Sequence, residues 1–370
     1  MALRALARVN LAAIERNVSR LRHAIGHGTQ LCAVVKADGY GHGAVQSARA
    51  ALDGGAAWLA VATAWEAAEL RNAGFEEPIL VMGAISAEEL PAALESGADV
   101  VAWSEDFVEL LGPGPARVHV KLDTGMGRLG TRDADEALRI AERVDAAPGL
   151  ELAGAMTHFA TADADLEFVA AQVERFDRFV NQLRVRWPEL LVHAANSAAT
   201  LAARNSHYDM VRCGIAIYGC DPMNHDPADW DLEPALELSS YVAAVKPARE
   251  GDSVGYGRRF VAGEDTKIAT LPIGYGDGIR RALTNNCDVL VRGHRYPLVG
   301  TVSMDNITLE VGGETDVRVG DTATIIGAES SERQTAEELA ARVGTINYEI
   351  VCGISGRVPR EYHRDGEHAG

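Results

Sequence analysis

LCAVVKADGYGHGAVQSARAALDGGAAWLAVAT, residues 31–63, contains two short apolar runs separated by a polar turn and an alanine-rich stretch. The runs LCAVVKA (31–37) and AWLAVAT (57–63) have the length and composition of buried strands. The stretch between them has the apolar spacing of a helix. This order of elements is a βα repeat, which is typical of a parallel sheet.

The same rhythm continues to about residue 220. Six further apolar runs follow: PILVMG (78–83), ADVVAWS (98–104), ARVHVKLDT (116–124), ELAGAMTHF (151–159), ELLVHAANS (189–197) and DMVRCGIAIYG (209–219). Helix starts between them are marked by the pairs Thr63/Glu66 and Ser86/Glu89, which fit the capping box, and by Ser104 before Glu105 and Asp106. Eight strands alternating with helices predict a (β/α)8 barrel, preceded by a helix near 11–25.

The pattern changes after about Pro234. Four segments read as turn-punctuated, mostly antiparallel strands: ALELSSYVAAVKP (235–247), TKIATLPIGYG (266–276), DVLVRGHRYPLVGTVSMDNITLEV (288–311) and DTATIIGA (321–328). One helix, TAEELAARVG (335–344), carries Thr335/Glu338 as its capping box. We therefore expect a barrel domain over 1–233 and a β domain over 234–370, in line with a length that exceeds one hydrophobic core.

The composition excludes several classes of protein. The net charge of −18 is spread along the chain, which argues against a surface for nucleic acid or anionic membrane. The N-terminal segment carries Arg4, Arg8 and Glu15, too close together for a secretory apolar region, so we expect a cytoplasmic protein. Five widely spaced cysteines lack the pairing of a zinc site, and we expect buried free thiols and no metal: Cys32, Cys213, Cys220, Cys287 and Cys352.

Polar residues cluster where the predicted strands end, which is the reactive face of such a barrel. They are Lys36 after the first strand, Lys121 and Arg128 after the fifth, His158 after the sixth, Asn196 and Ser197 after the seventh, and Arg212 to Tyr218 in the eighth. A lone lysine there is usually a solvated end residue. Lys36 differs because glycines follow it, which let the backbone approach a ligand, and because Tyr40 supplies a hydroxyl for a phosphate.

The run AVVKADGYGHG (33–43) resembles the cofactor-lysine motif of the alanine racemases. Eight further motifs of that family follow in order: KLDTGMGRLG (121–130), THFATAD (157–163), HAANSAAT (193–200), MVRCGIAIYG (210–219), SVGYGRRF (253–260), LPIGYGDG (271–278), VGTVSMDN (299–306) and NYEIVCGISGRVPR (347–360). The resemblance covers both expected domains. It implies a fold-type III pyridoxal-phosphate enzyme that interconverts L- and D-alanine and supplies D-alanine for peptidoglycan.

The resemblance implies two catalytic bases. Lys36 would hold pyridoxal 5'-phosphate as a Schiff base and act on D-alanine, and Tyr256 would act on L-alanine. Racemisation removes a proton from one face of the α-carbon and returns one to the other, which two bases on opposite faces achieve. A phenol of ordinary pKa near 10 needs cationic neighbours for this task, and His158 is a candidate. Without the motif, Tyr256 would read as a strand-face aromatic and His158 as a hydrogen-bonded strand-end histidine.

Other residues match cofactor-binding positions of the family. Arg212 would donate to the pyridine nitrogen, and because a guanidinium keeps its proton, the carbanion would be short-lived and transamination disfavoured. Asn196 lies in the same phosphate-side motif, and the phosphate would be bound by Tyr40, Ser197 and the amides of Gly214 and Ile215. Ser197 is equally plausible as a helix N-cap.

Substrate contacts also follow from the resemblance. Arg128 would bind the carboxylate of the amino acid, and Lys121 beside it occupies a position that is often carbamylated. The amide of Met304, which alone would read as a core residue, would contact the same carboxylate, with Tyr275 and Asp305 nearby. The family works as a head-to-tail homodimer in which the tyrosine and methionine of one subunit complete the site of the other.

One position departs from the family. Gly356 stands where many relatives have a tyrosine that contacts phosphate and narrows the entrance, so we expect looser access or tolerance of larger side chains. Alternatives remain open at this point: a broader amino-acid racemase, a decarboxylase of the same fold type, a non-catalytic cofactor-binding barrel, or a Schiff-base aldolase without cofactor. Arg212 and the absence of a glycine-rich phosphate loop oppose the decarboxylase, and Tyr256 opposes the non-catalytic barrel. The aldolase would have no use for Tyr40, Ser197 and Arg212 together.

Overall fold

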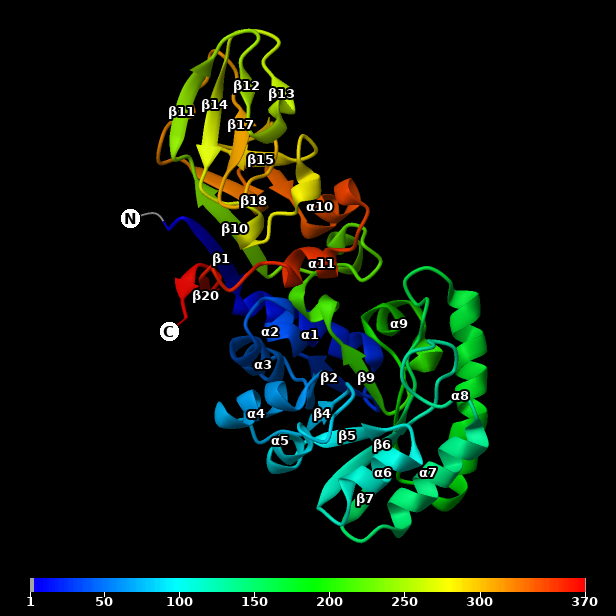
Figure 1. Cartoon of the computed structure of the whole chain (residues 1–370). Coiled ribbons are helices and arrows are strands. Elements are labelled where there is room, and N and C mark those ends of the chain that lie inside the picture. The colour runs from blue at the N-terminus through cyan, green and yellow to red at the C-terminus, as the bar shows by residue number, and fades with distance from the viewer. Residues whose placement is uncertain (1–2, 370) are drawn as a thin grey trace. The chain divides into compact units, whose positions relative to one another are not determined.

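The structure of the protein is a computed structural model that describes residues 3–369 (Figure 1). It divides into two compact units. One comprises Ile14–Met223, and the other comprises the chain up to Ala13 together with the chain from Asn224 onward. The domain boundaries expected from the sequence, 1–233 and 234–370, remain a proposal.

The first unit contains a closed barrel of eight parallel strands. They are β2 (Gln30–Val34), β3 (Trp58–Val61), β4 (Ile79–Val81), β5 (Asp99–Ala102), β6 (Ala116–Lys121), β7 (Leu150–Met156), β8 (Leu191–His193) and β9 (Met210–Cys213). The barrel closes where β2 pairs in parallel with β9, with Cys32 opposite Arg212. Each predicted apolar run overlaps one of these strands, and β2 and β7 begin one residue before their runs. The (β/α)8 prediction is confirmed.

Helices connect the strands on the outside of the barrel, and α8 runs along one side of it in Figure 1. The helical segments are α1 (Leu11–Ile25), α2 (Lys36–Tyr40), α3 (Ala44–Asp53), α4 (Ala64–Asn72), α5 (Leu90–Glu95), α6 (Glu105–Leu111), α7 (Ala134–Ala146), α8 (Leu166–Arg186), α9 (Ser197–Ala202), η1 (Arg204–Ser206) and η2 (Ile215–Tyr218). Thr63 and Glu66 form the predicted capping box of α4, and Ser104 caps α6. Each such cap satisfies backbone amides that a helix start leaves unpaired.

The second unit is built on mostly antiparallel sheets. The larger one has the order β16-β15-β18-β10-β1-β20-β21, with β19 paired to β18, and smaller sheets are formed by β11-β14-β17 and by β12-β13. The bounds are β1 (Ala5–Asn10), β10 (Leu236–Tyr241), β11 (Ala244–Ala248), β12 (Ser253–Val254), β13 (Phe260–Val261), β14 (Thr266–Leu271), β15 (Asp288–Val291), β16 (His294–Pro297), β17 (Ile307–Glu310), β18 (Thr322–Glu329), β19 (Glu332–Gln334), β20 (Arg360–Arg364) and β21 (Glu367–His368). The predicted antiparallel β domain is confirmed.

Several elements of this unit were not predicted, among them the strands β1, β12, β13, β19, β20 and β21 and a second helix. Strand β1 precedes the barrel in sequence but pairs antiparallel with β10 and parallel with β20. A second helix, α11 (Asn347–Cys352), follows the predicted helix α10 (Ala336–Val343), whose capping box Thr335/Glu338 is present. Four short 3-10 segments complete the unit: η3 (Pro227–Trp230), η4 (Tyr256–Arg258), η5 (Tyr275–Asp277) and η6 (Arg281–Leu283).

The cysteine prediction needs one correction. None of the five cysteines forms a disulfide, and four are buried, but Cys352 is exposed because it lies on the outer side of α11. Among residues 3–369, no helix is long and apolar enough to cross a membrane. No cluster of side chains suited to a metal ion occurs in the same range.

Candidate active site

Lys36 follows β2 and begins a turn of unusual handedness. Ala37, Asp38 and Gly39 have φ of 52°, 52° and 60° with ψ of 51°, 52° and 41°, which is the left-handed helical region. Each non-glycine residue in this region costs about 1–2 kcal/mol. A conformation of this cost persists only where its surroundings enforce it, and such positions cluster at functional sites.

Two carboxylates stabilise the turn. Asp38 accepts a hydrogen bond from the amide of Ala44 at 2.9 Å, at the start of α3. Glu66 accepts from the amide of Ala37 at 2.6 Å, although it also completes the capping box of α4. The helix α4 is thereby joined to the residue after Lys36. These contacts hold the lysine at the carboxyl end of its strand.

Tyr40 lies buried at the end of this turn. Its ring lies 5.2 Å from that of Tyr218, centroid to centroid, and the Nζ atom of Lys36 lies 6.0 Å from the Tyr40 ring centroid. A Cβ atom at Gly214 would lie 2.3 Å from the Tyr40 hydroxyl oxygen, so only glycine allows the approach. The hydroxyl of Tyr40 therefore faces the turn between β9 and η2.

The polar groups at the end of β8 lie beside the same turn. The amide of Gly214 donates to the Ser197 hydroxyl at 2.9 Å, and Ile215 is buried next to it. Asn196, rather than Ser197, is the N-cap of α9, because its side chain accepts from the amide of Ala199 at 2.9 Å. Ser197 is thus not needed as a cap, and its hydroxyl is aimed at the β9–η2 turn.

Arg212 is buried in β9 and its guanidinium is held from several sides. Its terminal nitrogens donate to the carbonyl oxygens of Thr157 and Ala194, both at 2.9 Å, and to the Nδ1 atoms of His193 at 2.7 Å and His158 at 3.2 Å. Its Nε atom is buried and has no partner among the described residues. Burial lowers the pKa of Arg212 to about 10, so the side chain is still a cation at neutral pH.

Positive charge dominates this end of the barrel. Burial, followed by the charges of Arg212 and Arg128, lowers the pKa of Lys121 from 10.5 to about 8. The same cations and Lys36 lower the pKa of His158 well below 6.5, again after burial as the first cause. This direction opposes a protonated His158, and a cationic role for it beside Tyr256 stays a prediction. The positive charge belongs to the arginines and lysines.

Arg128 lies on an exposed loop that one carboxylate organises. Asp123 accepts from the amides of Gly125 and Gly127, each at 3.0 Å, and from Arg132 at 3.1 Å. Burial would raise the pKa of Asp123, but these hydrogen bonds outweigh it and lower the pKa. The loop is preorganised while the Arg128 side chain is left accessible to solvent.

The second unit carries the remaining predicted residues on connected loops. Tyr256 is 74% exposed and Met304 51% exposed, and Tyr275 is exposed as well. The Thr301 hydroxyl donates to the carbonyl oxygen of Tyr256 at 2.7 Å, and the amide of Tyr275 donates to the carbonyl oxygen of Ser303 at 2.9 Å. The segment 301–304, which ends at Met304, is therefore hydrogen-bonded to the backbone of both tyrosines. The side chains of Tyr256, Tyr275 and Met304 are all exposed to solvent.

Ion pairs fix the base of these loops. Arg4 in the N-terminal segment binds the buried carboxylate of Asp277 with two hydrogen bonds, at 2.7 and 2.9 Å. Arg357 pairs with Asp305 at 2.8 Å and lies 3.5 Å from Asp277. At Gly356 an added Cβ would meet nothing within 4 Å, so the space for a larger side chain is open.

Comparison with known proteins gives one answer for both units. The models of the alanine racemase N-terminal and C-terminal domains match residues 9–222 and 235–362. The chain belongs to the alanine racemase family. Alanine racemase 2 of Caldanaerobacter subterraneus subsp. tengcongensis is 40% identical over 97% of this chain and 95% of its own. The alanine racemase of Symbiobacterium thermophilum is 42% identical over 96% of both chains.

Solved structures agree. A crystal structure of alanine racemase from E. faecalis superposes with a TM-score of 0.91 at 37% identity, covering 97% of this chain and 98% of that one. The alanine racemase of Bacillus anthracis with bound L-Ala-P superposes with a TM-score of 0.92 at 36% identity, covering 100% and 97%.

Within this alanine racemase fold, four residues with structural connections to the site escaped the sequence analysis. Glu66 was recognised only as a helix cap, whereas Asp99, His119 and His193 were passed over inside apolar runs. All three of the latter are buried and hydrogen-bonded to one another in the barrel interior. The signal was present, because a titratable residue inside an otherwise apolar strand is expected to have a buried partner.

Proposed function

We propose that this chain is an enzyme that interconverts L- and D-alanine with pyridoxal 5'-phosphate, using Lys36 and Tyr256 as its two bases. The observation that carries the proposal is the unpartnered Nε atom of the buried Arg212. A buried N–H without a partner is costly, so a ligand acceptor is expected opposite it. A pyridine nitrogen is such an acceptor, and Arg212 can only donate.

The other residues at this end of the barrel fit the same cofactor. Tyr40 and Ser197 place hydroxyls beside Gly214, whose missing side chain leaves the turn accessible, and the surrounding cations favour a phosphate. Lys36 would hold the cofactor through its amine. When bound, pyridoxal phosphate withdraws electrons from the α-carbon of an amino acid and makes its proton removable.

Arg212 sets the character of the reaction. A guanidinium keeps its proton at neutral pH, so Arg212 would hydrogen-bond the pyridine nitrogen without protonating it. Electron withdrawal would then be weaker than with a carboxylate partner, and charge at the α-carbon would be short-lived. This favours rapid return of the proton over transamination, and it opposes the decarboxylase alternative.

The second base and part of the substrate pocket come from the β-sheet unit. Tyr256 and Met304 are too exposed within one chain to work in a water-excluded site, so we propose that a second copy of the chain covers them in a homodimer. Arg128 and the Met304 amide would bind the substrate carboxylate, with Tyr275 and Asp305 at the edge of the pocket. Arg212, Arg128 and the lysines, rather than His158, would stabilise the Tyr256 phenolate.

The open space at Gly356 supports looser access to the site. Serine or larger amino acids would then be turned over measurably beside alanine. Negligible activity on them would remove this part of the proposal. A cytoplasmic location and a supply of D-alanine for peptidoglycan complete the proposed role.

The test begins with the purified protein. We expect a visible absorption band from the bound cofactor that is lost in Lys36→Ala. In deuterated water, L-alanine should exchange its α-proton and lose optical activity. Release of carbon dioxide, or no turnover by the cofactor-loaded protein, would overturn the assignment.

Tyr256→Phe tests the two-base arrangement. Proton exchange from L-alanine should fall by about 10²–10⁴ because a positioned base contributes about that factor. Exchange from D-alanine should fall less. Tyr208→Phe is the matched control, since Tyr208 bonds Asp177 on the outside of the barrel and should leave both exchanges unchanged. Equal losses from both enantiomers in Tyr256→Phe would contradict two bases.

A further inference from the structure

A chain of buried side chains runs through the barrel interior from Arg212 towards the amino ends of the strands. Arg212 lies 2.7 Å from Nδ1 of His193, and Nε2 of His193 lies 2.8 Å from Nδ1 of His119. Nε2 of His119 lies 3.0 Å from Oδ2 of Asp99, and Arg117 reaches the same oxygen at 3.2 Å. The four side chains from Arg212 to Asp99 come from four strands, β9, β8, β6 and β5, and Arg117, also on β6, lies at the outer end.

The barrel is shaped to accommodate the chain. The pairing of β6 with β7 shifts register between Val118 and His119, a bulge that redirects the histidine. Opposite it, a Cβ atom at Gly154 would lie 2.2 Å from Nδ1 of His119, so this position must be glycine. His119 also meets the edge of Trp58, with ring centroids 6.0 Å apart.

Only one arrangement of protons satisfies every bond in the chain. Arg212 is a donor only, so Nδ1 of His193 must accept and its proton must sit on Nε2. That proton is donated to Nδ1 of His119, whose own proton then sits on Nε2 and is donated to the Asp99 carboxylate. Burial and the charge of Arg212 lower the pKa of His193 well below 6.5, in agreement with a neutral ring.

We propose that Asp99 is a positioning residue for Arg212, and that it acts through His119 and His193 by fixing both rings as neutral Nε2–H tautomers. The Nδ1 lone pair of His193 is thereby always presented to the guanidinium. Arg212 is held with its Nε atom towards the position proposed for the pyridine nitrogen, and the inference rests on that proposed function. Without the carboxylate, His119 and His193 can reverse their protons, and His193 then opposes Arg212 with a second donor.

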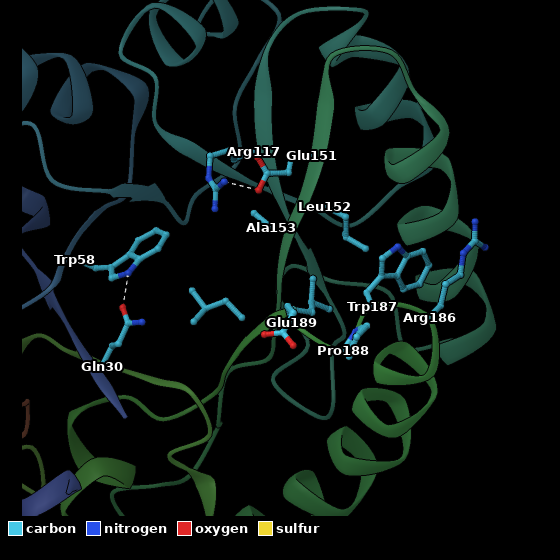
Figure 2. Close-up of a pocket in the computed structure, with 12 residues that line it drawn as sticks. Gln30, Trp58, Arg117, Glu151, Leu152, Ala153, Arg186, Trp187, Pro188 and Glu189 are labelled. Carbon is cyan, nitrogen blue, oxygen red and sulfur yellow. Dashed lines mark hydrogen bonds and ion pairs between the residues drawn. The ribbon is translucent and has the colours of Figure 1, made fainter. Parts of the chain in front are cut away.

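The hydrogen-bonded series of side chains ends at Arg117, which lines a cavity of about 520 Å³ at the amino end of the barrel (Figure 2). Its lining includes Arg117, paired with Glu151, and Trp58, whose indole N–H donates to Gln30 at 2.8 Å. Arg117 lines the cavity and also binds the Asp99 carboxylate. Replacing Asp99 with alanine would therefore leave a void next to this cavity. A small carboxylate could therefore enter and replace the lost group.

The first test reads the tautomers directly. Neutron crystallography of the deuterium-exchanged, cofactor-loaded protein should show deuterons on Nε2 and none on Nδ1 of both His119 and His193. In Asp99→Ala we expect a mixture or the reversed tautomers. A deuteron on Nδ1 of either ring in the parent protein, or unchanged tautomers in Asp99→Ala, would overturn the proposal. This readout does not require that the protein racemise alanine.

The second test separates positioning from general damage. Asp99→Ala should lower kcat about tenfold, as loss of partners behind a functional group typically does, and leave KM for alanine nearly unchanged. Sodium formate should restore most of kcat in this variant, whereas sodium chloride at equal ionic strength should not. Glu151 lines the same cavity but is not one of the hydrogen-bonded residues from Asp99 to Arg212. Glu151→Ala should therefore have the kcat and KM of the parent protein.

Each outcome has a defined meaning. A loss of kcat that formate does not restore would assign Asp99 to stability alone and overturn the positioning role. A parent protein that binds its cofactor but does not racemise alanine would instead overturn the proposed function, and the tautomers would still be measurable.

Discussion

The lowered pKa of Lys121 predicts that its amine reacts with carbon dioxide at neutral pH. With a pKa of about 8, roughly a tenth of this side chain is neutral at pH 7, against about 0.03% for an ordinary lysine of pKa 10.5. The reactive form is therefore about 300-fold enriched. The ammonium form first loses one proton, and the neutral amine then attacks carbon dioxide, forms a carbamate and releases a second proton. A buried cation is thereby replaced by an anion. Arg212, Arg128 and Lys36, which lower the pKa of the amine, attract the carbamate.

The assay is ¹³C NMR in ¹³C-bicarbonate. The chain has four lysines, Lys36, Lys121, Lys246 and Lys267, so the assignment is simple. A carbamate resonance should appear at pH 8, be absent in Lys121→Ala and persist in Lys246→Ala, an exposed control. The signal should shrink as the pH falls through 8 towards 6, because protonation removes the reactive amine. A resonance that survives Lys121→Ala, or none at pH 8 in excess bicarbonate, would refute the reasoning.

Three further changes test other parts of the structure. Gly214→Ala should lower the unfolding free energy by about 1–3 kcal/mol and weaken the visible cofactor band, because the new methyl group meets the Tyr40 hydroxyl; calorimetry and absorbance measure both. Glu66→Gln should destabilise by about 1–2 kcal/mol in urea titrations, since it removes the charge from a carboxylate that accepts from three backbone amides. Asp277→Asn should raise KM for alanine more than it lowers kcat, because Arg4 loses its buried partner beneath the Met304 loop; an unchanged KM would argue against this role.

Most of the barrel could be predicted because its signals are local. Each strand lies in a short apolar run, and some helix starts are marked by a side chain three residues from its partner, as at Thr63 and Glu66. Periodicity and capping depend only on neighbouring residues, so one sequence is enough to find them. The motif residues of the barrel unit also lie at or after strand ends, on the same end of the barrel.

Strand β1 shows where this reasoning stops. The segment from Ala5 to Asn10 alternates buried and half-buried residues, a pattern that is compatible with many partners. Its pairing with β10 and β20 joins residues more than 200 positions apart. Nothing local specifies such a pairing, and the ion pair of Arg4 with Asp277 depends on it.

The proton state of His158 is hard to predict from the sequence for a related reason. A histidine beside a base reads as a cation when only its own pKa of about 6.5 is considered. In the barrel it is buried and surrounded by Arg212, Arg128, Lys121 and Lys36, each of which disfavours a further positive charge. Burial and the charges of three separate segments, around Lys36, 121–128 and Arg212, lower the pKa together, and these segments meet only in the fold.

The orientation of Arg212 likewise depends on residues from separate segments, the buried histidines among them. Its orientation depends on a proton that sits on His193, whose position depends on His119, and finally on the charge of Asp99. Each link lies on a different strand, so the register of the barrel, rather than any single motif, connects the carboxylate to the guanidinium. A substitution at the amino end of the barrel is therefore expected to change how the carboxyl end binds the proposed cofactor. Among variants at the amino end, only those that interrupt the hydrogen-bonded chain should have this effect.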